Sequence, residues 1–145
     1  MQERCKIGVV IGNANSPHAV NIMKGIDQAS KECDVQIMYF MNVSSPYTAQ
    51  LYPPDTSIGW DYQKSAIYDY ARYVKADVLI MTYGMMSIFM KSDYGKQYLE
   101  YFRNVPCVLI NEQTDRPNWT SIIVDNYNGI YELVEHLVRD HGYHN

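Results

Sequence analysis

Short polar side chains gather directly after the first apolar run of the chain. Residues 12–18 read Gly-Asn-Ala-Asn-Ser-Pro-His and lead into an amphipathic stretch. At the start of a helix, free backbone N–H groups and the positive end of the helix dipole favour an acceptor or an anion. Asn13, Asn15 and Ser16 are therefore candidate ligand contacts, and helix capping is the alternative role for Ser16.

A second polar group follows the last apolar run. Residues 124–129 read Val-Asp-Asn-Tyr-Asn-Gly and precede another amphipathic stretch. Asp125 and Asn126 can cap that helix, which is a sufficient role for both residues. Asp125 is also a candidate ligand contact, for the same reason as the residues after the first run.

The chain carries no recognisable catalytic motif. Gly8 and Gly12 are four residues apart and no Gly-Lys-Ser/Thr follows, so a phosphate-binding loop is absent, and so is Gly-x-Ser-x-Gly. His141 and His144 have a spacing that could hold a metal on a helix, but exposed polar residues are the simpler interpretation. The sequence predicts no catalytic residue, no metal site and no cofactor.

Composition narrows the class of protein further. Apolar residues make up 47% and charged residues 19% of the 145 residues, and the net charge is −4. The twelve Lys and Arg are scattered, so the segment lacks the basic surface that nucleic-acid binding requires. No apolar run is long enough for a bilayer and no signal pattern opens the chain, which predicts a cytoplasmic protein without membrane contact.

The three cysteines are widely spaced and odd in number. This suits neither a disulfide framework nor a zinc site with paired ligands. We expect buried, reduced thiols at Cys5, Cys33 and Cys107.

Apolar runs and amphipathic stretches alternate along the chain. Runs rich in β-branched residues predict strands, and apolar residues at helical spacing predict the helices between them. The predicted strands are 6–11, 35–41, 77–81, 107–110 and 121–124, and the predicted helices are 18–33, 62–74, 95–103 and 128–139. This alternation predicts one α/β domain over residues 1–145, a doubly wound parallel five-stranded sheet of Rossmann-like, flavodoxin-type strand order.

The exception to the alternation is a long connection at residues 42–60. It contains Pro46, Pro53, Pro54 and Gly59 and has no periodicity. Connections of this length are often functional. A surface insertion and a loop that covers a ligand or a partner are equally compatible with it.

Parallel strands joined by crossover helices all end at the same edge of the sheet. Ser16, His18, Tyr83 and Asn111 should therefore lie on one concave surface there. A hydroxyl, an imidazole, a phenol and an amide suit a polar, largely uncharged ligand rather than a phosphate. The alternative is that Ser16 caps a helix, Asn111 ends a turn and Tyr83 only packs.

The segments quoted above, with Pro-Cys-Val-Leu-Ile at 106–110, Val-Glu-His-Leu-Val at 134–138 and His-Gly-Tyr at 141–143, resemble the first lobe of the lac-repressor and type I periplasmic-binding-protein superfamily. The resemblance covers nearly the whole chain. In that family the loops after the first, third and fourth strands line the ligand cleft. The matching positions are Ser16 and His18, Thr82 and Tyr83, and Asn111 and Glu112.

The chain departs from the family at two places. His18-Ala19 stands where an aromatic pair is common, and Asn111-Glu112 replaces an acidic-then-basic pair. The resemblance therefore implies a small polar ligand, sugar-like or another metabolite, without specifying a sugar.

The pattern Tyr62-Gln63 with Ala66-Ile67-Tyr68-Asp69, after a Pro-rich loop, resembles sensor lobes joined to GGDEF diguanylate cyclase, histidine kinase or AraC-type output domains. The expected organisation is one N-terminal lobe of a two-lobe sensor, with the second lobe and the output domain outside this sequence. A lac-repressor-type regulator of transcription is the related alternative.

Two hypotheses of other classes remain. A small flavodoxin-like enzyme is disfavoured, because no phosphate-cradling glycines, base or nucleophile are evident. A pure oligomerisation module is compatible with the fourteen tyrosines, which supply amphipathic contact area. We expect a homodimer, since a single lobe exposes its interlobe and helix faces.

Overall fold

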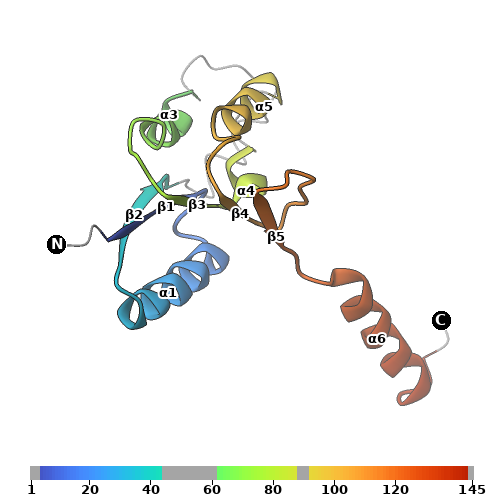
Figure 1. Ribbon diagram of the computed structural model, residues 1–145. Helices are drawn as coiled ribbons and strands as arrows, with labels where there is room; N and C mark the ends of the chain where they lie inside the picture. Colours follow the sequence, from blue (N-terminus) through green and yellow to red (C-terminus); the bar gives the residue numbers. More distant parts are fainter. Residues whose placement is uncertain (1–3, 44–61, 88–91, 144–145) are drawn as a thin grey trace.

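One parallel sheet organises the chain. The computed structural model describes residues 4–43, 62–87 and 92–143. The strands are β1 (Cys5–Ile11), β2 (Val35–Met41), β3 (Val78–Met81), β4 (Cys107–Ile110) and β5 (Trp119–Ile122). All neighbours pair in parallel in the order β2-β1-β3-β4-β5 (Figure 1). The predicted five-stranded, doubly wound α/β fold is confirmed.

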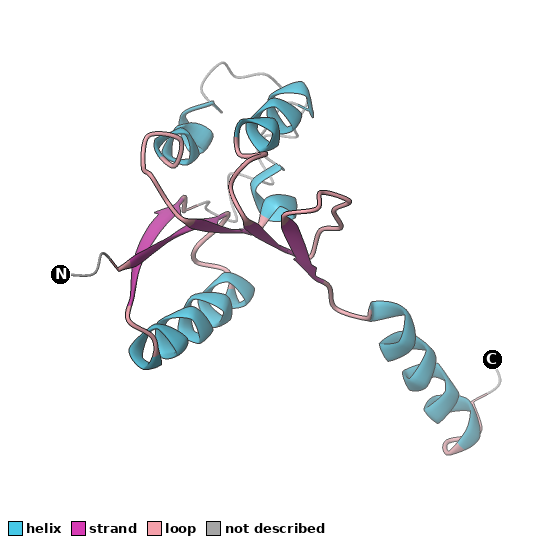
Figure 2. Cartoon of the chain, viewed as in Figure 1, coloured by secondary structure: helices cyan, strands magenta, loops and turns pink. Residues whose placement is uncertain are grey.

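Helices cover the two faces of this sheet unevenly. The helices in the described residues are α1 (Pro17–Glu32), α3 (Tyr62–Tyr70), α4 (Tyr83–Ser87), α5 (Ser92–Tyr101) and α6 (Asn126–Arg139), of which the first four lie on the sheet. Figure 2 shows α1 against one face, with α3, α4 and α5 on the other. The final helix, α6, extends beyond the β5 edge instead of lying over the strands.

The strand residues alternate between two hydrophobic clusters. Val10, Leu79 and Leu109 pack beneath α3 and α5, whereas Val9 and Ile11 pack against α1. These β-branched and leucine side chains are essentially excluded from water. Each contributes about 1.5 to 3 kcal/mol to the stability of the fold by its burial. The apolar runs are continuous because strands in the middle of the sheet are covered on both faces.

Local signals set the boundaries of α1. The Ser16 hydroxyl accepts a hydrogen bond from the backbone N–H of Ala19 over 3.1 Å, and Pro17 occupies the first turn, where its missing N–H is not needed. The helix ends where the Cys33 N–H donates to the Ala29 carbonyl from an extended backbone.

The fifth strand lies two residues earlier than predicted. The apolar run at residues 121–124 suggested a strand there, but pairing with β4 begins at Trp119 and ends at Ile122. Trp119 is buried in the core on the α5 side, and its indole N–H donates to the Val105 carbonyl over 3.0 Å. Cross-strand pairing and this buried ring therefore decide the position of the strand.

A short helix, α4, was not predicted. It begins directly after β3, where the Thr82 carbonyl accepts from the N–H groups of Met85 and Met86. Five residues are too few to show a helical periodicity, although Met86 is fully buried. The predicted long connection lies outside the described residues from residue 44 onward.

Two of the three cysteines contradict the predicted burial. Cys5 and Cys33 are exposed, because Cys5 opens the first strand and Cys33 ends α1 at the same, amino-terminal side of the sheet. Cys107 is buried within β4 as predicted. Burial raises the pKa of its thiol to about 12, which keeps it protonated and weakly nucleophilic at neutral pH.

Across the described ranges, no helix has the length and apolar character needed to traverse a bilayer.

Candidate functional site

The candidate site lies where β1, β3 and β4 end. Asn13 and Asn111 each follow one of these strands and adopt left-handed backbone conformations, with φ of 48° and 59°. Asparagine tolerates this region better than most residues, and such conformations are frequent at ligand sites. In both places the backbone turns sharply as it leaves the sheet.

Thr82 joins the end of β3 to the end of β1. Its hydroxyl is buried and accepts a hydrogen bond from the Gly12 N–H over 3.0 Å, while its own N–H donates to the Val10 carbonyl over 3.0 Å. The predicted site residue Thr82 is thus a positioning residue, because its only hydroxyl is turned inward. It fixes where the Asn13 loop begins.

Asn42 holds the other side of the same loop. It follows β2, is buried, and its Oδ1 accepts from the Asn13 N–H over 2.8 Å. Its carbonyl accepts from the Ala14 N–H over 2.8 Å. In the sequence, Asn42 is only the first residue of the long connection, because a partner 29 residues away leaves no local pattern.

His18 and Asn111 meet across the edge of the sheet. Asn111 Nδ2 lies 3.1 Å from His18 Nε2, although 93 residues separate them in sequence. The two groups can share a hydrogen bond in which the amide N–H donates to the ring nitrogen, when the histidine tautomer leaves Nε2 without a proton. Both side chains are exposed and reachable from solvent. This contact brings the loop after β4 to the first turn of α1.

Glu112, after β4, lies close enough to Tyr83, the first residue of α4, for its charge to act on the phenol. Burial and, to a lesser degree, the negative charge of Glu112 raise the pKa of the Tyr83 phenol, which keeps its O–H as a donor. Gly95 leaves room for this ring, since a Cβ there would lie 2.5 Å from the Tyr83 hydroxyl oxygen. The Glu112 carboxylate approaches Gly84, the second residue of α4.

The remaining predicted residues have mainly local roles. Ser16 uses its hydroxyl to cap α1, as the alternative interpretation held. Asp125 caps α6 and is exposed, and hydrogen bonds from the backbone and side-chain N–H groups of Asn128, at 3.0 and 2.6 Å, lower its pKa. Asn15 is exposed beside the Asn13 turn.

Histidines form one further cluster, at the end of α6. His136 Nε2 lies 3.1 Å from His141 Nε2, and His136 Nδ1 lies 2.5 Å from a carboxylate oxygen of Asp140. No group of three or more potential metal ligands converges in the part of the chain that the structure describes. His144, the other half of the predicted pair, lies outside the described residues.

The site residues therefore offer hydrogen bonding and no evident covalent chemistry. Donors and acceptors come from an amide, an imidazole and a phenol, and the charged groups among the nine candidates are carboxylates. A shallow hollow elsewhere, lined by Leu99, Glu100 and Arg116 among others, contains none of the candidates. Comparison with protein-family models and with curated proteins finds no match to this chain.

Replacing Thr82 by valine should lower the free energy of unfolding by about 1 to 3 kcal/mol, because the buried Gly12 N–H loses its acceptor while the shape is kept. Urea unfolding followed by circular dichroism measures the change. Thr82→Ser, which keeps the hydroxyl and removes only a methyl group, is the matched control and should cost about 0.8 kcal/mol. Equal effects of the two substitutions would mean that the Thr82 hydroxyl does not hold the loop.

Proposed function

We propose that this chain is a ligand-sensing lobe that binds a small, polar, uncharged molecule at the carboxyl edge of its sheet. The supporting observation is the contact of His18 with Asn111, which joins the loops after β1 and β4. Ligands of open parallel sheets bind at this edge, where the strand order reverses. Here the reversal falls between β1 and β3, and the two loops follow β1 and β4, the next neighbour of β3.

The charges of the candidate residues favour an uncharged ligand. Glu112 and Asp125 are the ionised groups among the nine candidate residues, and none of the nine is Lys or Arg. A phosphate or carboxylate ligand would meet repulsion and no cationic partner. A polyol, a sugar-like molecule or another neutral metabolite can instead use the Asn111 amide, the His18 ring and the Tyr83 hydroxyl.

The same proposal places this lobe in a larger signalling protein. A second lobe would close over the ligand, and closure would bias an attached output domain such as a diguanylate cyclase, a histidine kinase or a regulator of transcription. In this proposal the segment itself is not an enzyme, is cytoplasmic, and contacts neither nucleic acid nor membrane. The resemblance to lac-repressor-type sensors and the doubly wound sheet both favour it.

Chemical-shift mapping of the 145-residue chain tests the site. Neutral polyols, monosaccharides and nucleosides are titrated beside sugar phosphates, and we expect millimolar binding of a neutral compound with shifts at His18, Tyr83 and Asn111. Binding should be weak because one lobe covers only one side of a ligand. Sub-micromolar affinity would contradict the two-lobe proposal, and preferential binding of the phosphates would contradict the ligand class.

The substitution Asn111→Leu should abolish those shifts, because it removes the amide that contacts His18. Asn104→Leu, at an exposed position before β4, is the matched control and should leave binding unchanged. An unchanged titration with Asn111→Leu, or an equal loss in the control, would remove this surface as the binding site.

A further inference from the structure

The apolar face of α6 is exposed along its whole length. Seven large apolar or aromatic side chains of this helix have exposed fractions between 37% and 78%, and no α6 residue is buried. They are Tyr127, Ile130, Tyr131, Leu133, Val134, Leu137 and Val138. An amphipathic helix derives most of its stability from burying such a face, so α6 requires a partner.

The sheet carries a matching uncovered surface on its α1 side. Register places Ile80, Val108 and Thr120 in one row across β3, β4 and β5, and Ile110 and Ile122 in the next row. Ile80 packs into the α1 cluster. Val108 and Ile110 are only partly buried and Ile122 is 56% exposed, so cover ends beyond β3. We call Val108, Ile110, Thr120 and Ile122 the open sheet face.

The helix and the open sheet face do not meet within one chain. A short extended linker of three residues follows β5, and Ile123 and Val124 in it are also exposed. Asp125 then starts α6 by capping the Asn128 N–H. In Figure 1 the helix continues away from β5, past the edge of the sheet. A chain with both a helix that extends from the fold and an uncovered surface that fits this helix can form a dimer in which two copies exchange the helix.

We propose that two copies of this chain exchange their α6 helices, each α6 packing its apolar face onto the open sheet face of the other copy. The exchange supplies the helix layer that β4 and β5 lack on the α1 side. It covers the exposed apolar side chains of both helices and both open sheet faces at once, and this burial drives the association. Pairing of α6 with α6 alone would leave both sheet faces uncovered.

Light scattering on the 145-residue chain tests the exchange with two charge substitutions. We expect a dimer, and we expect Leu133→Glu on the helix and Ile122→Glu on the sheet each to raise its dissociation constant at least about 100-fold. Both positions are exposed within one chain, so neither change threatens the core. Glu132→Lys, on the polar side of α6, is the matched control and should leave the dimer intact.

Other occupants of the α6 face give different results, and each overturns the proposal. A dimer broken by Leu133→Glu but not by Ile122→Glu indicates pairing of the two helices. A monomeric chain at high concentration indicates that α6 closes on its own sheet or packs against the second lobe of the proposed sensor. The double variant Ile122→Cys and Leu133→Cys, with Cys5→Ser and Cys33→Ser, should cross-link between copies under oxidation. A cross-link within one chain would contradict the exchange.

Discussion

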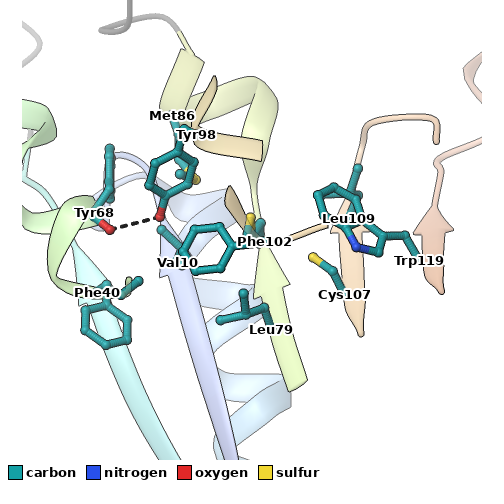
Figure 3. Packing of buried hydrophobic residues seen from close by; sticks show 12 residues of the cluster. Val10, Phe40, Tyr68, Leu79, Met86, Tyr98, Phe102, Cys107, Leu109 and Trp119 are labelled. Carbon is teal, nitrogen blue, oxygen red and sulfur yellow. Dashed lines mark hydrogen bonds between the residues drawn. The ribbon is translucent and has the colours of Figure 1, made fainter. Parts of the chain in front are cut away.

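Replacing Tyr98 by alanine is expected to lower the free energy of unfolding by about 3 to 5 kcal/mol. The side chain is completely buried where α5 packs on the sheet (Figure 3). Its ring meets Phe102 edge-to-face at 5.1 Å between centroids, and the Arg72 guanidinium lies 5.2 Å from the ring centre. Truncation leaves a cavity among these neighbours and removes the ring contacts together.

The Tyr98 hydroxyl adds a smaller contribution that Tyr98→Phe isolates. It donates to the Tyr68 carbonyl over 2.9 Å and so ties α5 to α3. Removing the donor leaves that carbonyl buried without this partner, which should cost about 1 to 2 kcal/mol. Burial also raises the pKa of the phenol far above its usual value, so the hydroxyl stays a donor throughout the neutral range.

Urea unfolding of both variants at one chain concentration measures these differences, since any dimer contributes to the apparent stability. Tyr73→Ala is the control for tyrosine truncation, because Tyr73 is 82% exposed, and it should change stability by less than about 0.5 kcal/mol. If Tyr98→Ala behaved like Tyr73→Ala, α5 would not be packed on the sheet as described.

Replacing Gly12 by alanine should destabilise the protein by about 3 kcal/mol, at the upper end for an overpacked site. The new Cβ would lie 2.7 Å from the carbonyl carbon, 2.8 Å from the carbonyl oxygen and 2.9 Å from the Cβ of Met85. Two of these atoms are backbone, so a side-chain rotation cannot relieve the clash. Either β1 or α4 must move.

If the proposed ligand binds at this edge, the same substitution should also weaken its binding, because Gly12 donates to Thr82 and precedes the Asn13 turn. Gly25→Ala provides a control of opposite sign. A Cβ at Gly25 meets nothing within 4 Å, and the position is in the middle of α1, so alanine should stabilise by about 0.5 to 1 kcal/mol. Thermal unfolding that ranks the two variants the other way would contradict the close approach of α4 to β1.

The sequence predicted which loops lie at the candidate site, but not which side chains hold those loops in place. Parallel topology alone implied that the loops after β1, β3 and β4 meet at one edge, and His18 and Asn111 do meet there. The pattern could not separate residues that face solvent from those that hold the loops. The Thr82 hydroxyl accepts from Gly12 and the Asn42 side chain accepts from Asn13. Both hydrogen bonds join residues distant in sequence, so neither role could be predicted.

Local sequence patterns were sufficient for α1, α3, α5, α6 and the central strands, although not for the short α4. Continuous apolar runs suffice for strands inside the sheet, and the run at Cys107–Ile110 predicted β4 with its correct bounds. The stripe of α6 and its Asp125 cap likewise specify a helix without reference to the rest of the chain.

The positions of β5 and α6 relative to the sheet depend on tertiary contacts and could not be predicted from local patterns. The position of β5 depends on pairing with β4 and on the buried Trp119 ring, so an apolar run two residues later was a misleading guide. Periodicity shows that α6 has an apolar face but carries no information on which surface receives it. Which surface buries that face depends on tertiary contacts, and these leave no pattern in the helix sequence.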